Sequence, residues 1–463
     1  MKIETIRLAW AGHANSAGAF PRLEGEEVFR LDEKAVLIIG GGIAGIQSSI
    51  DLANMGKKVY LVEKKPSIGG RMAQLDKTFP TNDCAMCILA PKMIECANHE
   101  NITLLTYSEV LEVQGEQGNF RARILKKARF VEESKCVGCG ECAAKCPTKV
   151  VDEFNAGLGV RKAIYKYFPQ AVPSTYVIDP EHCRLKQGKK CGVCEKTCKA
   201  KAINYEQKDS EIVLEVGAVV MATGFDLYNV APLKEYGWST LPNVLTAMQF
   251  ERMICASGPT GGHLKRPSDG KEPVSLAFIQ CVGSRDVRHK RYCSAVCCMH
   301  ATKEAILAHE HCRGLSSTIF YMDMRAVGKG FQDYVRRAKS EYSVDYVRAR
   351  PGRITENEEN HNPVIHYEDT VTRELKAREF DMVVLSQALI PSESNLSVAG
   401  KLGVDLDEFG FVSMTRELID PFTTNRDGIF ACGFCQSPMD VPDSVIRASA
   451  AASKVAEALA RGH

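Results

Sequence analysis

The sequence predicts an α/β fold in which strands alternate with helices and a small cysteine-rich domain is inserted, and three observations predict it. The first is a strand, glycine turn, helix and strand over residues 34–63. The second is a pair of four-cysteine runs between residues 136 and 198. The third is a later strand-like segment, residues 218–225, that contains a Thr-Gly turn. The chain of 463 residues is long enough for about three domains.

The glycine turn has the spacing of a dinucleotide-binding fingerprint. Gly40, Gly42 and Gly45 hold the G-x-G-x-x-G positions, which serve the tight turn, the approach of the backbone to a pyrophosphate, and the packing of helix on strand. Glu63 closes the second strand, where an acidic residue bonds a ribose hydroxyl. A glycine-rich structural turn is the alternative, but the flanking strands disfavour it. The segment therefore predicts a Rossmann-type domain.

Later segments resemble flavoproteins that have two dinucleotide-binding domains, of the thioredoxin reductase-like type. In that superfamily an Ala-Thr-Gly segment returns the chain to the FAD domain, and a final segment, here around Gly433, meets the flavin. Phe434 stands where the superfamily usually has Asp, which puts the ribityl contact in doubt. The helix that follows can still favour negative charge on a reduced flavin through its dipole. Besides the three glycines and Glu63, the expected FAD-binding residues are Ile43, Ala44, Lys64, Gly70, Arg71, Met72, Ala222, Thr223, Gly224, Gly433, Pro442, Asp443 and Ser444.

The expected domain organisation follows from these segments. Residues 1–33 form an N-terminal extension, and the FAD-binding domain consists of residues 34–127, 208–247 and 386–463. A two-cluster ferredoxin-like domain, residues 128–207, is inserted into it. A second nucleotide-binding-like domain covers residues 248–385. The apolar and aromatic linker at residues 159–173 is expected to pack against a neighbour rather than act as a slack tether.

The two cysteine runs predict a pair of 4Fe–4S clusters. The first run has the C-x2-C-x2-C-x3-C-P spacing of bacterial ferredoxins, and the second has C-x7-C-x2-C-x3-C. In such proteins the fourth cysteine of each run ligates the other cluster. Zinc sites are the alternative, which two linked runs and the Cys-Pro ending disfavour. The expected ligand sets are Cys136, Cys139, Cys142 and Cys198 for one cluster, and Cys183, Cys191, Cys194 and Cys146 for the other.

The second domain lacks the glycine turn of a pyridine-nucleotide site. Its strand-like run from Val274 leads to Cys281-Val-Gly-Ser, so direct NAD(P)H binding is not expected. Cys281, Cys293, Cys297 and Cys298 lie within eighteen positions and offer four thiolates for a third cluster. Buried free thiols are the alternative, because the spacing matches no general cluster template.

Other cysteines are less informative. Cys84 and Cys87 form a Cys-x-x-Cys that is either redox-active or structural, and Cys96 leaves this group one ligand short of a cluster. Cys432 and Cys435 are interpreted as small packing residues. The same interpretation applies to Cys255, Cys312 and His300.

The composition limits the classes of function that are plausible for this chain. A net charge of +2 argues against nucleic acid or an anionic membrane as the principal partner, and no stretch is apolar enough to cross a bilayer. Nineteen cysteines without a secretion signal indicate metal ligation in a reducing compartment, so the sequence predicts a cytoplasmic protein. Exposed clusters would suit an anaerobe.

Several segments together resemble the A-subunit of heterodisulfide reductase and its bacterial relatives. They are residues 83–93, 167–173, 281–286, 292–303 and 442–444, and the likeness runs from about Lys34 to the C-terminus. The resemblance implies that the Cys281–Cys298 group carries a cluster beside FAD, which gives three 4Fe–4S clusters in all. It also implies that Lys303 approaches the flavin, where a cation would stabilise negative charge on the reduced cofactor.

The resemblance implies an electron-transfer component of a larger complex. FAD would exchange electrons with a wire of clusters, and some family members bifurcate electrons. The methanogen protein has a further N-terminal cluster domain and a C-terminal ferredoxin domain that are not expected here, so other partners would connect the chain. Expected partners are further redox subunits, ferredoxin-type or hydrogenase or dehydrogenase donors, and a second copy of the chain within the complex. The alternatives are a self-sufficient NAD(P)H oxidoreductase and a docking subunit with structural clusters.

Overall fold

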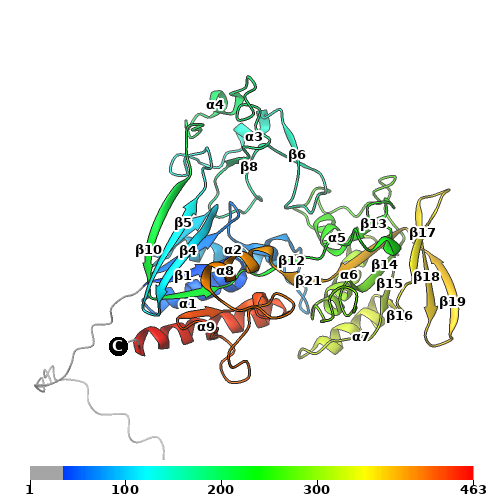
Figure 1. Ribbon diagram of the computed structural model, residues 1–463. Helices are drawn as coiled ribbons and strands as arrows, with labels where there is room; N and C mark the ends of the chain where they lie inside the picture. The colour runs from blue at the N-terminus through cyan, green and yellow to red at the C-terminus, as the bar shows by residue number, and fades with distance from the viewer. Residues whose placement is uncertain (1–34, 462–463) are drawn as a thin grey trace, which may run out of the picture. The chain divides into compact units, whose positions relative to one another are not determined.

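The computed structural model describes residues 35–461 (Figure 1). Its first layer is a five-stranded parallel sheet with the strand order β22-β11-β1-β2-β3. The strands are short and almost entirely buried, as expected for a parallel sheet that is covered on both faces. The expected N-terminal extension, residues 1–33, lies outside the described residues. The bounds are β1 Val36–Ile39, β2 Val59–Glu63, β3 Ile102–Thr106, β11 Ala218–Met221 and β22 Ile429–Ala431.

Alternate residues of β1 show how the two faces of this sheet are covered. Val36 and Ile38 belong to a core with the helices α1, α2 and α9, whereas Leu37 and Ile39 belong to a core with the strands β4, β5 and β10 and with α8. This is the period-two alternation of a strand between two layers. The bounds are α1 Ile43–Asn54, α2 Ala85–Asn98, α8 Glu393–Leu402, α9 Val441–Arg461, β4 Ser108–Glu116, β5 Asn119–Lys126 and β10 Ser210–Val216.

The cysteine-rich segment leaves the FAD-binding domain between two paired strands. Lys126 at the end of β5 faces Ser210 at the start of β10, so residues 127–209 replace what would otherwise be a hairpin turn. This segment contains two one-turn helices and two small antiparallel ribbons (Figure 1). The bounds are α3 Glu141–Lys145, α4 Val193–Thr197, β6 Lys149–Val151, β7 Val160–Lys162, β8 Ile164–Tyr165 and β9 Val177–Ile178.

The linker inside this segment packs against the FAD-binding domain, which confirms the prediction made from its composition. Phe168 is buried in the same core as α1 and α2, and its ring stacks on that of Phe154 at a centroid distance of 4.9 Å. Arg252 connects this region to the second domain. Its guanidinium donates to the Gln74 carbonyl and the Asn155 side chain, each at 2.9 Å.

The second domain has its own five-stranded parallel sheet, with the order β13-β20-β14-β15-β16, and a three-stranded antiparallel sheet, β17-β18-β19. The prediction of an α/β fold with two nucleotide-binding-like domains is therefore confirmed. The strand bounds are β13 Val244–Thr246, β14 Ser275–Val282, β15 Ser316–Tyr321, β16 Asp345–Arg348, β17 Arg353–Asn357, β18 Asn362–Asp369, β19 Glu374–Glu379 and β20 Met382–Gln387. The helices are α5 Ala247–Ile254, α6 Cys297–His311 and α7 Phe331–Glu341.

A short antiparallel ribbon carries the chain between the two domains. β12, Phe225–Leu227, leaves the FAD-binding domain, and β21, Leu389–Pro391, returns to it. The three 3-10 turns are η1 Gly70–Gln74, η2 Lys234–Tyr236 and η3 Gly433–Cys435. None of the described helices is both long and apolar enough to span a membrane.

Candidate functional site

A cavity of about 1230 Å³ opens at the carboxyl ends of the strands of the first sheet. Its lining comes from the ends of β1, β2 and β11, from η1, from the start of α9, and from α5 and α6 of the second domain. Ligands of open α/β sheets bind at this edge, because loops and helix N-termini converge there. The cavity is therefore the candidate site for FAD.

The glycine turn that opens onto this cavity has no room for side chains. Gly40 has a φ of +113°, and a Cβ there would lie 2.3 Å from the Ala222 carbonyl oxygen. A Cβ at Gly45 would lie 1.8 Å from the Gly40 carbonyl oxygen, because α1 packs closely on the turn. No side chain caps the N-terminus of α1. Its first amides can therefore bind a phosphate, and the residues present fit a dinucleotide.

Glu63 lines the cavity and also holds the glycine turn. One carboxylate oxygen accepts the Gly41 amide and the other accepts the Lys65 amide, each at 2.7 Å. Burial raises the pKa of Glu63, although these hydrogen bonds oppose the shift. A carboxylate that already accepts two amides still has lone pairs for a ribose hydroxyl.

Most of the sequence-predicted FAD-binding residues border the cavity. Arg71 is fixed there by an ion pair of 2.7 Å with Asp226 of β12. The predicted residues in the lining are Gly40, Gly42, Ile43, Ala44, Glu63, Lys64, Gly70, Arg71, Met72, Ala222, Thr223, Gly224 and Ser444.

Four predicted residues do not line the cavity. Gly45 lets α1 pack closely on the glycine turn, and a Cβ at Gly433 would lie 2.7 Å from the Ala44 side chain. Both glycines therefore allow close backbone packing. Pro442 and Asp443 lie in the first turn of α9, whose residue Ser444 does reach the cavity.

Several lining residues come from distant parts of the chain and have no signal in the sequence. Thr223 shares a hydrogen bond of 2.7 Å with Asn395, and Lys401 lines the cavity from α8. Phe434 also borders it, in place of the superfamily's Asp. The interpretation of His300 as a packing residue is incomplete, because this side chain lines the cavity too. No local pattern in the sequence marks Asn395 or Lys401, whereas the segments around Gly224 and Gly433 do point to Thr223 and Phe434.

The structure brings three of the four cysteines predicted to ligate the third cluster together at the end of β14. A bulge interrupts the pairing of β14 with β20 between Ile279 and Val282, and Cys281 in this bulge has a φ of +59°. Cys297 lies close enough to Cys281 and Cys298 to interact with both sulfurs. Cys293 is half-buried, and its sulfur accepts the Ala295 amide at 3.4 Å.

These cysteines are electrostatically prepared for metal ligation. The interaction with Cys297, helped by the charge of Arg285, lowers the pKa of Cys281 to about 7. The pKa of Cys298 is also lowered by its interaction with Cys297, whose own pKa is raised because the two neighbouring sulfurs and burial disfavour its thiolate. Thiolates are the form that binds iron, so the donor set fits a cluster. Cys297 also lines the cavity, which makes this cysteine group adjacent to it.

A buried charged network lies behind the same wall of the cavity. The Lys303 ammonium contacts both carboxylate oxygens of Glu251 at 2.7 Å, and both side chains are almost fully buried. His300 lies between Glu251, at 3.4 Å, and Glu304, at 3.5 Å. Burial raises the pKa of Glu304 well above its usual range and lowers that of His300. Lys303 does not itself line the cavity; its cation balances Glu251.

The ferredoxin-like segment places four of its cysteines around one small cavity. Cys146, Cys183, Cys191 and Cys194 line one small cavity, which is the set predicted for one cluster. Burial, together with the nearby Cys136 and Cys139 sulfurs, raises the pKa of Cys142 to about 12. A thiol of this kind needs the metal charge to become a thiolate. The Tyr205 hydroxyl lies 2.9 Å from the Cys194 sulfur, which is a hydrogen bond to a predicted cluster ligand.

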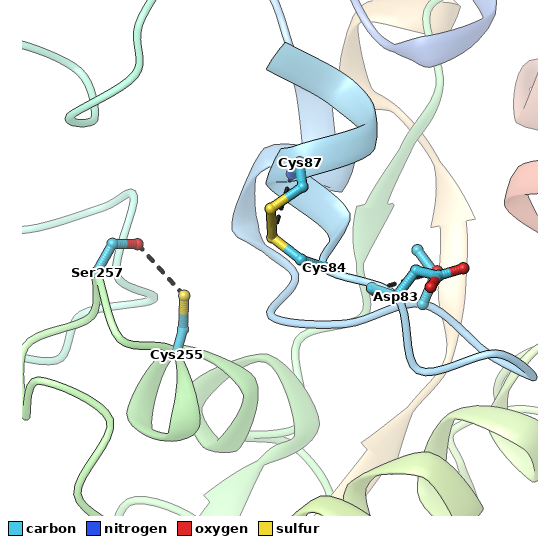
Figure 2. Close-up of a disulfide and its surroundings, with 6 residues drawn as sticks. Asp83, Cys84, Cys87, Cys255 and Ser257 are labelled. Carbon is cyan, nitrogen blue, oxygen red and sulfur yellow. Dashed lines mark hydrogen bonds between the residues drawn. A yellow bond between two sulfur atoms is a disulfide. The ribbon is translucent and has the colours of Figure 1, made fainter. Parts of the chain in front are cut away.

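Cys84 and Cys87 form a disulfide at the start of α2, as Figure 2 shows. Cys96 is fully buried on the same helix and does not join them. Cys255 is a buried thiol that bonds with Ser257 at 3.3 Å, which is consistent with its interpretation as a packing residue (Figure 2). Cys432 and Cys435 are also fully buried free thiols, as expected.

Comparison with known proteins places these features in a family. Residues 35–124 match the family described as FAD dependent oxidoreductase, and residues 130–152 match the 4Fe-4S binding domain. A CoB–CoM heterodisulfide reductase iron–sulfur A-subunit of Methanopyrus kandleri is 49% identical over 95% of this chain and 67% of its own length. The chain belongs to the heterodisulfide reductase A-subunit family. The resemblance inferred from the motifs is thereby confirmed.

Other members of the heterodisulfide reductase A-subunit family show a similar relationship. The CoB–CoM heterodisulfide reductase iron–sulfur A-subunit of Methanocaldococcus jannaschii is 50% identical over 93% of this chain and 65% of its own length. The A-subunit of the H(2):CoB-CoM heterodisulfide,ferredoxin reductase of Methanothermobacter thermautotrophicus is 44% identical over the same two fractions. The chain thus spans about two thirds of the length of these three curated relatives.

A solved structure has the same fold as this member of the heterodisulfide reductase A-subunit family. Thioredoxin reductase of Lactococcus lactis matches with a TM-score of 0.51 and 15% identity, over 92% of this chain and 99% of that chain. The predicted thioredoxin reductase-like fold is therefore confirmed. The family descriptions also confirm an FAD-binding and a 4Fe–4S-binding part.

Proposed function

We propose that the chain is the FAD- and iron–sulfur-containing electron-transfer subunit of a heterodisulfide reductase-like complex. The observation that carries the proposal is the position of Cys297, which lines the cavity and lies next to Cys281 and Cys298. FAD, when bound, supplies the exchange between two-electron and one-electron carriers. The cysteine group at the cavity wall would hold the cluster that first accepts or donates single electrons.

The proposed wire has three 4Fe–4S clusters. Cys281, Cys293, Cys297 and Cys298 would hold the one beside the cavity, and the two cysteine sets of the inserted domain would hold the others. The supporting evidence is the lowered pKa of the Cys281 and Cys298 thiols and the grouping of four cysteines around one small cavity in the inserted domain. This domain is inserted between β5 and β10, outside the FAD-binding sheets, so its clusters would be placed to pass electrons to a partner subunit.

Lys303 enters the proposal with a changed role. Because its ammonium is neutralised by Glu251, we do not expect it to act on the flavin as a free cation. The pair instead fixes His300, which contacts Glu251 and lines the cavity. Lys303 is thus a positioning residue in this proposal, and its loss should move the flavin potential through His300.

The partners and the location are also proposals. The expected partners are other redox subunits, a ferredoxin-type or hydrogenase or dehydrogenase donor, and a second copy of the chain. A cytoplasmic location is expected from the cysteine-rich composition. Electron bifurcation is tested by the flavin potentials, because it requires a semiquinone that is not stable over a wide range of potential.

The test is the content of iron, acid-labile sulfide and FAD in anaerobically purified protein. The proposal predicts about twelve irons per FAD, from about four in each cluster. Cys297→Ser should lower this to about eight irons with FAD retained. The matched control is Cys255→Ser, because Cys255 is a buried thiol outside all three sets. About eight irons in the unchanged protein would withdraw the cluster beside the cavity but leave the other two.

A cheap second measurement addresses the alternative oxidoreductase. NADH or NADPH added to the isolated chain should not bleach the flavin, because a cysteine-bearing bulge stands where β14 would need a glycine turn. Bleaching without a partner subunit would overturn the proposal.

A further inference from the structure

The Cys84–Cys87 disulfide is a chemical group that the proposed function does not use. It lies at the N-terminus of the 14-residue helix α2. Neither sulfur borders the cavity, and neither residue belongs to the three proposed cluster sets. The possible roles are a structural cross-link, a metal-ligand pair and a redox-active disulfide.

Solvent access separates this pair from the other cysteines of the same region. Cys87 is exposed and Cys84 is half-buried, whereas Cys96, Cys255 and Cys312 are buried. A thiol from solution can therefore reach the Cys87 sulfur without local unfolding. Thiol–disulfide exchange requires this access.

The surroundings also give the two sulfurs different roles. Cys84 is the N-cap of α2, and its sulfur accepts the backbone N–H of Cys87 at 3.1 Å. A sulfur at this position is stabilised as a thiolate by the hydrogen bond and by the positive end of the helix dipole. A stabilised thiolate is the better leaving group in exchange. Attack on the exposed Cys87 and departure of Cys84 are thus favoured together.

A metal site is a weaker explanation. Two cysteines are too few for a zinc or iron–sulfur site. Within the part of the chain that the structure describes, the one cluster of three or more ligand-type side chains close enough for a single ion is Glu251, His300 and Glu304. None of these residues accompanies Cys84 or Cys87.

We propose that Cys84–Cys87 is a thiol–disulfide exchange site that takes two electrons from an external dithiol. The incoming thiolate attacks the Cys87 sulfur, the bond between the sulfurs breaks, and Cys84 leaves as a thiolate. The second thiolate of the donor then attacks the donor sulfur that is bound to Cys87 in the mixed disulfide. Cys87 is released as a thiolate. The donor is oxidised to a disulfide, and Cys84 and Cys87 take up two protons. The proposal does not depend on FAD or on the clusters.

Two exposed apolar side chains allow a test of whether the dithiol donor is a protein. Ile88 and Ile94 of α2 are 39% and 53% exposed, and both lie on the helix that carries Cys87. A protein donor that docks on α2 would contact them, whereas a small dithiol would not.

The first experiment is a redox titration of the full-length holoprotein under anaerobic conditions. Samples are equilibrated with mixtures of reduced and oxidised dithiothreitol, free thiols are alkylated, and the protein is digested with trypsin. Cleavage after Lys77 and Lys92 releases peptide 78–92, in which Cys84 and Cys87 are the only cysteines. Mass spectrometry then counts the labels on this peptide directly.

The expected result is a reversible two-electron conversion. The ratio of doubly labelled to disulfide-linked peptide should change a hundredfold when the ratio of reduced to oxidised dithiothreitol changes a hundredfold. Cys255→Ser, the matched control, should leave the titration unchanged. A peptide that stays disulfide-linked at every ratio would overturn the proposal in favour of a structural cross-link. Two cysteines that never form a disulfide, or a loss of iron in Cys84→Ser, would overturn it in favour of free thiols or metal ligands.

Single substitutions test which sulfur is attacked. With 5,5′-dithiobis(2-nitrobenzoate), Cys84→Ser leaves only Cys87 and should give a persistent mixed disulfide on peptide 78–92, because no resolving thiol remains. Dithiothreitol, which attacks the protein sulfur and releases the nitrothiobenzoate, should cleave this mixed disulfide at least about tenfold faster than the one on Cys84 in Cys87→Ser, because Cys84 is less accessible. Equal or reversed rates would overturn the assignment of Cys87 as the attacked sulfur.

A double substitution shows whether the donor is a protein dithiol or a small dithiol. Ile88→Asp with Ile94→Asp should slow reduction by a protein dithiol, reduced thioredoxin, about tenfold and leave reduction by dithiothreitol unchanged. If neither rate changes, the proposed protein donor is wrong and a small dithiol is the source. Both side chains are exposed, so the variant is expected to fold.

Discussion

Lys303→Met removes the cation from the buried network beside the cavity. The Lys303 ammonium contacts both oxygens of Glu251 at 2.7 Å, and the two side chains are 1% and 0% exposed. Methionine keeps most of the apolar stem, so the change leaves the packing of α6 largely intact. What remains is a buried carboxylate without its cation.

The expected cost is about 3–5 kcal/mol of the free energy of unfolding of the second domain, the range for breaking one partner of a buried ion pair. Lys303→Met combined with Glu251→Gln should recover most of this loss, because no unpaired charge is then buried. Recovery of stability in the double variant would also show that the loss comes from the unpaired charge of Glu251 and not from a packing defect.

Trp238 provides the assay. It lies next to α5, where its indole N–H donates to Gln249 at 3.2 Å, so its fluorescence reports the second domain. The other tryptophan, Trp10, lies outside the described residues and is replaced by Phe in all samples. Anaerobic urea unfolding then compares the single variant, the double variant and the parent.

The pH dependence supplies a second check. Burial alone would raise the pKa of Glu251, but Lys303 and His300 outweigh it and lower the pKa to about 2. In the parent, this stabilisation is present above the ordinary carboxyl pKa and is lost as the pH falls toward 2. In the variant the carboxyl is buried without its cation, so its pKa is raised and protonation stabilises the folded state. The difference in the free energy of unfolding between the parent and Lys303→Met should therefore become smaller as the pH falls from about 8 to about 5.

Two results would refute this reasoning. One is a cost below about 1 kcal/mol for Lys303→Met, which would show that Glu251 is not left as an unpaired charge. The other is a double variant no more stable than the single one. In either case the network would not be the positioning device for His300 that we propose.

The remaining predictions concern the inserted domain and the flavin cavity. Tyr205→Phe removes the 2.9 Å hydrogen bond to the Cys194 sulfur and should lower the potential of that cluster by about 20–60 mV in an EPR-monitored titration, with iron content unchanged. No shift would mean that this sulfur does not ligate a cluster. Gly45→Ala places a Cβ 1.8 Å from the Gly40 carbonyl oxygen and should abolish FAD retention, measured as flavin per protein. The control is Gly400→Ala in α8, where nothing lies within 4 Å of the added Cβ; equal flavin loss in both variants would contradict the role of the turn.

The cofactor chemistry could be predicted from the sequence because its signals are local. The glycine turn and the four-cysteine runs depend on residues a few positions apart, and backbone geometry fixes what such spacings can do. Thirty residues from Lys34 to Glu63 already contain a strand, turn, helix and strand, and the structure has them as β1, α1 and β2. The composition of the apolar linker also predicts that it packs, and Phe168 lies in the core.

The arrangement around the cavity needed the tertiary structure, because its residues are far apart in the chain. The spacing of Cys281 to Cys298 left buried thiols open as an alternative, and only folding brings Cys297 to the cavity wall. Lys303 was expected at the flavin, yet its ammonium pairs with Glu251, 52 positions earlier. No periodicity encodes which of several buried carboxylates a lysine will meet.

By itself, then, the sequence determined the fold class, the FAD-binding fingerprint and the ferredoxin motif, since each follows from short-range backbone and ligand geometry. The tertiary structure decided which groups meet: where the insertion leaves the sheet, at Lys126 and Ser210, and which side chains share the cavity. It also decided that Cys84 and Cys87 form an accessible disulfide at a helix terminus. The physical reason is that contact, burial and charge pairing depend on distances across the fold, which spacing along the chain does not contain.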